Sequence, residues 1–230
     1  TQRRKVVLTL PEPIFGQQDW GELNGRKLSF TNEDDRFDAC KWYIDTALAY
    51  WKKSQLDQLD FAGFYWVAEQ NSDGQHLIPR IAAYIKQKGL KFYWIPYWKA
   101  EGHGDWQKVG FDAAYQQPNH FFEENIPDSR LDEACDFAKA HGMGMEMEFD
   151  SRVEQTNFEK RLQAYIDAFE KHGVLQHAAM AYYEGGDAMM KLAASADPKN
   201  RAIYKKVCDL IVERQKKADE IRKVKPRKTK

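Results

Sequence analysis

The chain has 230 residues, and its 35 lysines and arginines are balanced by 35 aspartates and glutamates, so its formal net charge is zero. This balance argues against a nucleic-acid partner, and 43% hydrophobic residues are enough to bury a core. No apolar run approaches the roughly 20 residues that a membrane-spanning helix needs, so we expect a soluble globular protein without a membrane span.

The first residues of the chain and the spacing of its cysteines lead to two expectations, one about its extent and one about its thiols. It opens with a charged run, Thr1 to Lys5, rather than with a methionine or a signal peptide, which indicates a segment of a longer protein. Cys40, Cys135 and Cys208 are odd in number, far apart and set in apolar helical patterns. We expect buried free thiols rather than disulfides or a zinc site.

Short apolar runs predict six β-strands. In chain order they cover residues 6–10, 61–69, 90–98, 111–117, 143–150 and 177–184.

Apolar residues at helical spacing predict a helix after most of these strands. The predicted helices cover residues 37–51, 77–85, 131–138 and 158–169, and a last one begins near Pro198. Basic residues followed by glycine, at Gly89, Gly142 and Gly173, are typical of helix C-termini, because glycine adopts the left-handed cap and cations face the negative end of the dipole.

Alternating strands and helices predict an α/β fold with parallel strands. An open doubly wound sheet usually carries a glycine-rich phosphate loop, and neither common form of that motif occurs. We therefore expect a (β/α)8 TIM-barrel type fold whose first two βα units precede Thr1, so that six units are visible. The predicted barrel domain is residues 1–215, followed by a solvated basic tail, residues 216–230.

The active site of such a barrel forms at the carboxyl ends of its strands, and each predicted strand delivers polar or aromatic groups there. The run from Met143 to Asp150 is the most informative. Its alternation places Glu146, Glu148 and Asp150 on the face opposite the methionines. Buried carboxylates require partners, a metal or a chemical task, although an edge strand with a solvated acidic face would also explain them.

Paired carboxylates in a cleft rimmed with aromatic residues suit glycoside hydrolysis. If the visible strands are the third to the eighth, Glu69 and Glu148 occupy the positions of the acid/base and nucleophile in retaining barrel glycosidases, which the chain resembles in this respect. Ala68, however, precedes Glu69 where that superfamily commonly has asparagine. Glu146 replaces Glu148 if the strand is shifted by one residue pair.

Further residues are candidates for substrate binding, each with a structural alternative. Trp98 offers a stacking surface or belongs to the core, and Gln116 and Asn119 bind hydroxyls or cap a turn. The complete set of substrate-binding candidates is Glu12, Trp98, Gln116, Asn119, Glu146, Asp150, Tyr182 and Glu184.

No cofactor or metal is predicted. The six histidines form no HExxH pattern, and no motif for a catalytic serine or cysteine is present. An oxygen-ligand site for a divalent cation, built from Glu12, Glu146, Glu148 and Glu184, is the alternative arrangement of the same acids.

Several long motifs resemble the bacterial domain-of-unknown-function family 4855. They are the segments 63–66 (GFYW), 91–98 (KFYWIPYW), 114–119 (AYQQPN) and 142–150 (GMGMEMEFD). The resemblance covers most of residues 6–186. It implies a barrel akin to those of glycosidases and an exported protein, whether secreted, periplasmic or on the cell surface, of the kind frequent in carbohydrate-degrading gut Bacteroidetes. It implies no particular reaction.

The sequence thus predicts a glycoside hydrolase acting on a polysaccharide or glycan, with Glu69 as general acid/base and Glu148 as nucleophile. Two alternatives use the same residues: a metal-dependent sugar isomerase or lyase, and a glycan-binding barrel without catalysis. The pattern indicates a carbohydrate partner and gives no oligomeric state.

Overall fold

The computed structural model describes residues 3–71 and 76–224. The chain divides into two compact units. The first unit comprises residues 1–117 and 141–143, and the second comprises residues 118–140 and 144–230. Each unit is described by itself.

The first unit is built on parallel strands. Its strands are β1 (Arg4–Leu10), β4 (Leu59–Trp66), β5 (Lys91–Trp94) and β6 (Ala113–Gln116), which lie in that order in the sheet. Neighbours pair in parallel throughout. Their carboxyl ends therefore share one edge of the sheet, and the loops that follow β1 and β4 are neighbours there, because Leu10 pairs with Trp66.

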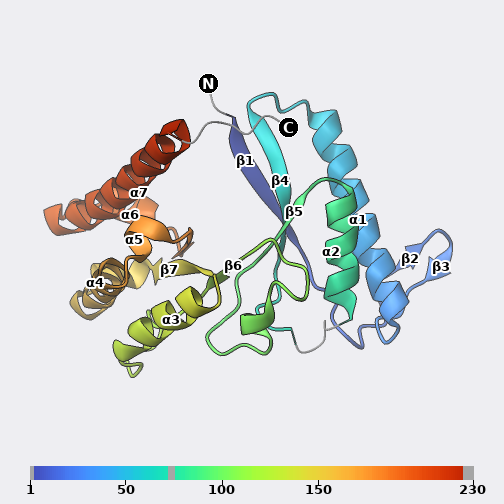
Figure 1. The fold of residues 1–230 in the computed structure, drawn as a ribbon, viewed down its shortest axis with the longest axis horizontal. Coiled ribbons are helices and arrows are strands. Elements are labelled where there is room, and N and C mark those ends of the chain that lie inside the picture. The colour runs from blue at the N-terminus through green and yellow to red at the C-terminus, as the bar shows by residue number, and fades with distance from the viewer. Residues whose placement is uncertain (1–2, 72–75, 225–230) are drawn as a thin grey trace. The chain divides into compact units, whose positions relative to one another are not determined.

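Two helices cover one face of this sheet, where α1 (Glu33–Ser54) and α2 (Leu77–Gln87) lie side by side (Figure 1). Asn32 caps α1 by accepting a hydrogen bond from the backbone N–H of Asp34. Before α1, the chain forms a small antiparallel hairpin of β2 (Glu22–Leu23) and β3 (Arg26–Lys27). A short 3₁₀ turn, η1 (His103–Asp105), follows β5.

Aromatic residues of the strands form much of the buried core of the first unit. Trp66 and Trp94 are completely buried, and Trp94 stacks on Phe111 with ring centroids 5.0 Å apart. Close strand packing also explains Gly63. A β-carbon there would lie 1.9 Å from the backbone oxygen of Lys91, so no larger residue fits without moving β5.

The second unit combines a parallel pair of strands with several helices. The strands are β7 (Gly144–Asp150) and β8 (Met180–Gly185). The helical segments are α3 (Ser129–Ala140), η2 (Ser151–Glu154), α4 (Thr156–Lys171), α5 (Val174–His177), α6 (Ala188–Ala194) and α7 (Pro198–Val224).

The two faces of β7 differ as the sequence predicts. Met147 pairs with Tyr182 of β8, which contacts Arg214 of α7, whereas Glu148 is contacted by Tyr165 of α4 (Thr156–Lys171), so helices meet both faces. Glu148 pairs with Tyr183, so the acidic residues of β7 lie on the opposite face.

The predicted α/β class and all six predicted parallel strands are confirmed within the described part of the chain. Helices α2, α3 and α4 each end two residues before a predicted glycine, and these glycines have φ angles of +72°, +66° and +69°. The described residues do not by themselves form a closed eight-stranded barrel. No helix among them is long and apolar enough to cross a membrane.

The expectation of a separate basic tail needs adjustment, whereas the expectation of free cysteines does not. Residues 216–224 continue α7 rather than forming a separate tail, and residues 225–230 of the predicted tail lie outside the described residues. The three cysteines are free, with Cys40 and Cys135 buried, as the sequence predicts.

Candidate functional site

Glu69 lies in the loop after β4, at the carboxyl edge of the first unit's sheet. The predicted strand is too long, because β4 ends at Trp66, and the side chain of Glu69 is exposed. Gln117 donates a hydrogen bond from its amide nitrogen to Oε1 of Glu69 at 3.0 Å and another to the carbonyl of Ile95 at 3.0 Å. The carboxylate of Glu69 is thus held from the loop after β6.

Gln116, the last residue of β6, is completely buried. Its amide nitrogen donates to the carbonyls of Pro96 and Gln117 at 3.3 and 2.9 Å, and its oxygen lies 2.7 Å from Nδ1 of His103. Because the amide oxygen can only accept, His103 is the donor. These contacts engage both ends of the Gln116 amide and favour its structural role.

Trp98 is half-buried in the loop after β5. Its ring meets the ring of His103 edge-on, with centroids 6.5 Å apart, and the ammonium of Lys99 lies 5.6 Å from the indole. Burial lowers the pKa of His103. Trp98 therefore belongs to the polar edge of the sheet rather than to the buried core that holds Trp66 and Trp94.

Glu12 lies in the Pro-Glu-Pro segment that follows β1. Its Oε1 lies 3.5 Å from Nη2 of Arg36 on α1, and the Arg36 side chain is only 4% exposed. Nε of Arg36 donates to the carbonyl of Pro13 at 2.8 Å. Arg36 thereby fixes both the charge and the backbone of this segment.

Glu148 has the most developed surroundings of the predicted acids. It lies in β7 and is 2% exposed. Its Oε2 accepts hydrogen bonds from the hydroxyl of Tyr165 at 2.7 Å and from the backbone N–H of Asn119 at 2.8 Å, and the Asn119 amide lies 3.4 Å from Oε1. The expectation that a buried acid on this strand has partners is confirmed at Glu148.

Tyr165, on α4, links Glu148 to the loop after β6. Its hydroxyl donates to Glu148 and accepts a hydrogen bond from the backbone N–H of His120 at 3.3 Å. Burial, reinforced by the neighbouring carboxylate of Glu148, raises the pKa of Tyr165 well above its ordinary value. The hydroxyl therefore remains a donor at any physiological pH.

The loop that presents Asn119 is held by two arginines. Arg161 of α4 is buried and donates to the backbone carbonyls of His120, Phe121 and Ile126. Arg152 donates to the carbonyl of Phe122 at 3.1 Å. These contacts fix the loop backbone, so the N–H of Asn119 is directed at Glu148 before any ligand arrives.

The remaining predicted residues of the second unit have other contacts. Glu146 is buried in β7. Asp150 caps η2 through the N–H of Arg152 and forms an ion pair with the Arg152 guanidinium at 2.8 Å. The Tyr182 hydroxyl contacts Met180 and Arg214, and Glu184 accepts a hydrogen bond from the N–H of Met189 at the start of α6.

Sequence reasoning missed the residues that organise these carboxylates. Tyr165 reads as one more member of the apolar stripe of α4, Gln117 lies in the segment 114–119 but has no predicted role there, and Arg161 belongs to no motif. Only their hydrogen bonds in the folded structure identify them as residues that position the carboxylates. An arginine on the buried stripe of an amphipathic helix is the one local signal, since a buried charge requires several acceptors.

The oxygen-ligand cation site that the sequence leaves open is not assembled in the described residues. No group of three or more histidine, cysteine, aspartate or glutamate side chains is gathered there closely enough to hold a metal ion.

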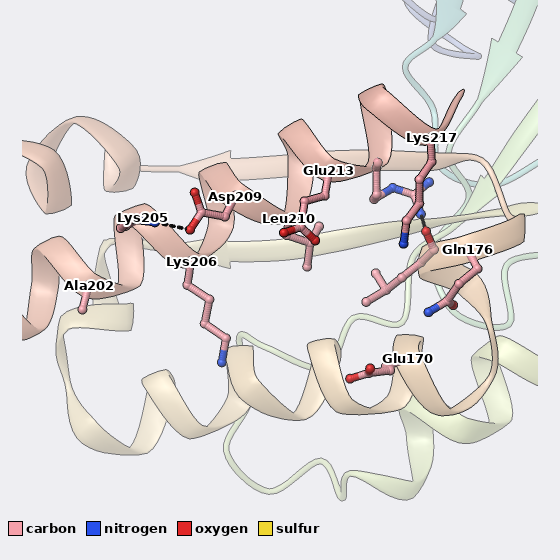
Figure 2. Close-up of a pocket in the computed structure, with 11 residues that line it drawn as sticks. Glu170, Gln176, Ala202, Lys205, Lys206, Asp209, Leu210, Glu213 and Lys217 are labelled. Atoms are coloured by element: carbon pink, nitrogen blue, oxygen red, sulfur yellow. Dashed lines mark hydrogen bonds and ion pairs between the residues drawn. The ribbon is translucent and has the colours of Figure 1, made fainter. Parts of the chain in front are cut away.

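A groove of about 490 Å³ lies between α4, α5 and α7 of the second unit (Figure 2). Three of its charged side chains are engaged with one another or with the backbone. Lys205 pairs with Asp209, and Arg214 donates to the carbonyl of Ala178 at 2.8 Å. None of the predicted site residues lines this groove, so it adds nothing to the candidate site.

The fold and these contacts define an α/β protein with parallel strands. Near the carboxyl ends of these strands, Glu69 and Glu148 are each fixed by hydrogen bonds. The family model described as "Domain of unknown function (DUF4855)" matches residues 1–209, and the chain belongs to this family. No curated protein matches the chain.

One similar solved structure is from Bacteroides thetaiotaomicron VPI-5482 and is described as a "putative alpha-L-fucosidase". The two share 15% sequence identity with a TM-score of 0.51, over 78% of this chain and 64% of that one. At this identity the likeness shows a common fold, and this chain spans 64% of the length of that structure.

Proposed function

We propose that this protein is a glycoside hydrolase acting on a polysaccharide or glycan, with Glu148 as nucleophile and Glu69 as general acid/base. The observation that carries the proposal is the environment of Glu148. A carboxylate near the end of a strand is buried and accepts hydrogen bonds from a tyrosine hydroxyl and a backbone N–H. The fold shared with a structure described as a "putative alpha-L-fucosidase" agrees with this class of reaction.

The chemistry assigned to Glu148 requires a fixed, ionised carboxylate. In a retaining mechanism, one of its oxygens attacks the anomeric carbon while the glycosidic C–O bond breaks, which gives a covalent glycosyl ester. The two short hydrogen bonds fall on Oε2, whereas the Asn119 amide lies 3.4 Å from Oε1, and Oε1 is the oxygen proposed to attack. Donors that hold one oxygen orient the other without neutralising its charge.

Glu69 has the properties required of the second role. In the first step, its carboxyl proton goes to the departing glycosidic oxygen, and in the second step the resulting carboxylate accepts a proton from the water that cleaves the ester. Such a group exchanges protons with solvent between turnovers, and Glu69 is exposed. Its hydrogen bond from Gln117 orients the carboxyl group and leaves its second oxygen for the proton.

A screen of the protein against aryl glycosides and glycans tests the proposal, beginning with α-L-fucosides. Glu148→Gln and Glu69→Gln should each lower kcat by at least a thousandfold on the substrate found, whereas Glu133→Gln, an exposed site on α3, should leave kcat unchanged. With an activated aryl leaving group, the loss in Glu69→Gln should be smaller, because such a group needs no proton.

Product analysis separates the roles. Azide should restore turnover to Glu148→Ala and give a glycosyl azide, since a small anion replaces the missing nucleophile. Wild-type turnover in Glu148→Gln would remove this residue from the mechanism. Saturable glycan binding without hydrolysis across the whole panel would instead indicate a glycan-binding protein.

A further inference from the structure

A small pocket in the first unit lies between α1 and the segment that follows β1. We call it the Trp42 pocket. Its volume is about 250 Å³, somewhat below the roughly 300–1,000 Å³ of pockets for drug-sized ligands, so its size suits a single ring. The residues that line it include Glu12, Gln17, Trp20, Phe30, Trp42 and Tyr43.

Aromatic rings form most of the apolar wall. Trp20 meets Trp42 edge-on with centroids 5.4 Å apart, and it packs against Phe30 at 5.7 Å. Phe30 is completely buried, whereas 44% of Trp42 is exposed. Contact with its neighbours thus fixes the Trp42 indole while much of its surface stays open to a ligand.

The polar side of the pocket carries hydrogen-bonding groups without a net charge. Glu12 contributes a carboxylate that is 26% exposed, and Gln17 contributes an amide. The guanidinium of Arg36 lies 3.5 Å from Glu12 and balances its charge. A cationic ligand would meet a neutralised pair here, whereas a hydroxylated neutral ligand would still find acceptors.

The pocket is formed before any ligand binds. Phe30 donates its N–H to the carbonyl of Gln17 at 2.9 Å, and Gly16 donates to the carbonyl of Phe30 at 3.2 Å, so these two segments are tied together. Cys40 also lines the pocket, and burial raises the pKa of its thiol to about 12. The thiol is therefore neutral and adds no charge or nucleophile.

We propose that the Trp42 pocket is a carbohydrate subsite that holds one sugar ring of the glycan. The C–H face of the ring would lie on the Trp42 indole, and hydroxyls would donate to Glu12 and to the oxygen of Gln17. The choice of a sugar as occupant rests on the proposed function. The pocket and the loop of Glu69 follow neighbouring strands at the same edge of the sheet, which suits consecutive parts of one glycan.

Binding and hydrolysis are measured separately. Methyl glycosides of L-fucose, D-galactose, D-glucose and N-acetyl-D-glucosamine are titrated into the full chain carrying Glu148→Gln, and the indole N–H signals are followed by NMR. The sugar that binds should shift the Trp42 signal. Trp42→Ala should weaken its affinity at least tenfold, Trp42→Phe should restore part of the loss, and Glu12→Gln should weaken it about threefold.

The matched control is Tyr50→Ala, which removes another exposed aromatic ring from the same helix, α1. It should leave affinity within twofold of the parent value. The Tm of each variant shows whether the fold is retained.

The two proposals can fail independently. If no sugar of the panel shifts the Trp42 signal, or if Trp42→Ala and Tyr50→Ala bind equally well, the subsite proposal is wrong even where the wild-type chain hydrolyses a glycoside. If binding depends on Trp42 but the wild-type chain hydrolyses nothing, the subsite stands and the catalytic assignment falls.

Discussion

Replacing Tyr165 by phenylalanine tests the polar network around Glu148 directly. The change removes one oxygen and leaves the ring, which packs against His120 and Phe169. The buried carboxylate of Glu148 loses its 2.7 Å donor, and the N–H of His120 loses its acceptor. Hydrogen bonds to charged groups contribute about 1.5–3 kcal/mol, and an orphaned buried N–H costs about 1 kcal/mol or more.

We therefore expect Tyr165→Phe to lower the free energy of unfolding by about 2.5–4 kcal/mol, or the Tm by about 5–16 °C for a chain of this length. Urea denaturation followed by circular dichroism gives the value. Tyr115→Phe is the control. Tyr115 is half-buried, and its hydroxyl makes no hydrogen bond within residues 3–71 and 76–224, so its loss should cost less than about 0.5 kcal/mol.

A double-mutant cycle of Tyr165→Phe with Glu148→Gln isolates the interaction energy between the tyrosine hydroxyl and the carboxylate. If the hydroxyl acts through the carboxylate, the two changes should be non-additive by about 1 kcal/mol or more. Full additivity, or an equal loss in Tyr165→Phe and Tyr115→Phe, would show that the short contact contributes nothing and would refute the reasoning.

Two further predictions follow from the packing and from a buried histidine. Gly63→Ala places a methyl group against the backbone of Lys91 and should cost more than about 3 kcal/mol in urea denaturation, whereas Gly89→Ala, with open space around it, should cost about 1 kcal/mol; equal costs would contradict the close approach. Burial, with Arg161 nearby, lowers the pKa of His120. The folded state then binds fewer protons than the unfolded state, so Tm should fall as pH drops from about 7 through 6.5, the ordinary histidine value. His120→Gln should flatten this slope, and His177→Gln, at an exposed site, should leave it unchanged.

Local patterns were sufficient to predict the succession of strands and helices. Apolar runs and terminal glycines act within a few residues, and the glycines after α2, α3 and α4 have the positive φ angles that their positions require. The hairpin of β2 and β3 was missed, although Asn24 and Gly25, with φ angles of 55° and 76°, are typical turn residues. Its strands are too short to show any alternation.

Strand ends were predicted less well, and this affects the candidate site. The apolar run from Phe61 continues past the last paired residue, Trp66, because Val67 and Ala68 look like strand residues but lie in the loop. Glu69 is therefore a loop residue whose position depends on Gln117 rather than on strand geometry. A hydrogen bond between residues 48 positions apart leaves no trace in local sequence.

The surroundings of Glu148 show why a carboxylate can be predicted while its role cannot. Alternation along β7 places the acid on the face opposite the methionines, since that pattern is a property of the strand alone. Whether a buried carboxylate can act in catalysis depends on which hydrogen-bond donors reach it. Here those donors come from α4 and from a loop that Arg161 holds by its carbonyls. A lysine or arginine at the position of Tyr165 would form an ion pair with the same acid and leave it a structural residue. The tyrosine hydroxyl at this position instead donates a short hydrogen bond without carrying a charge, and this contact is the one on which the proposed role of Glu148 rests.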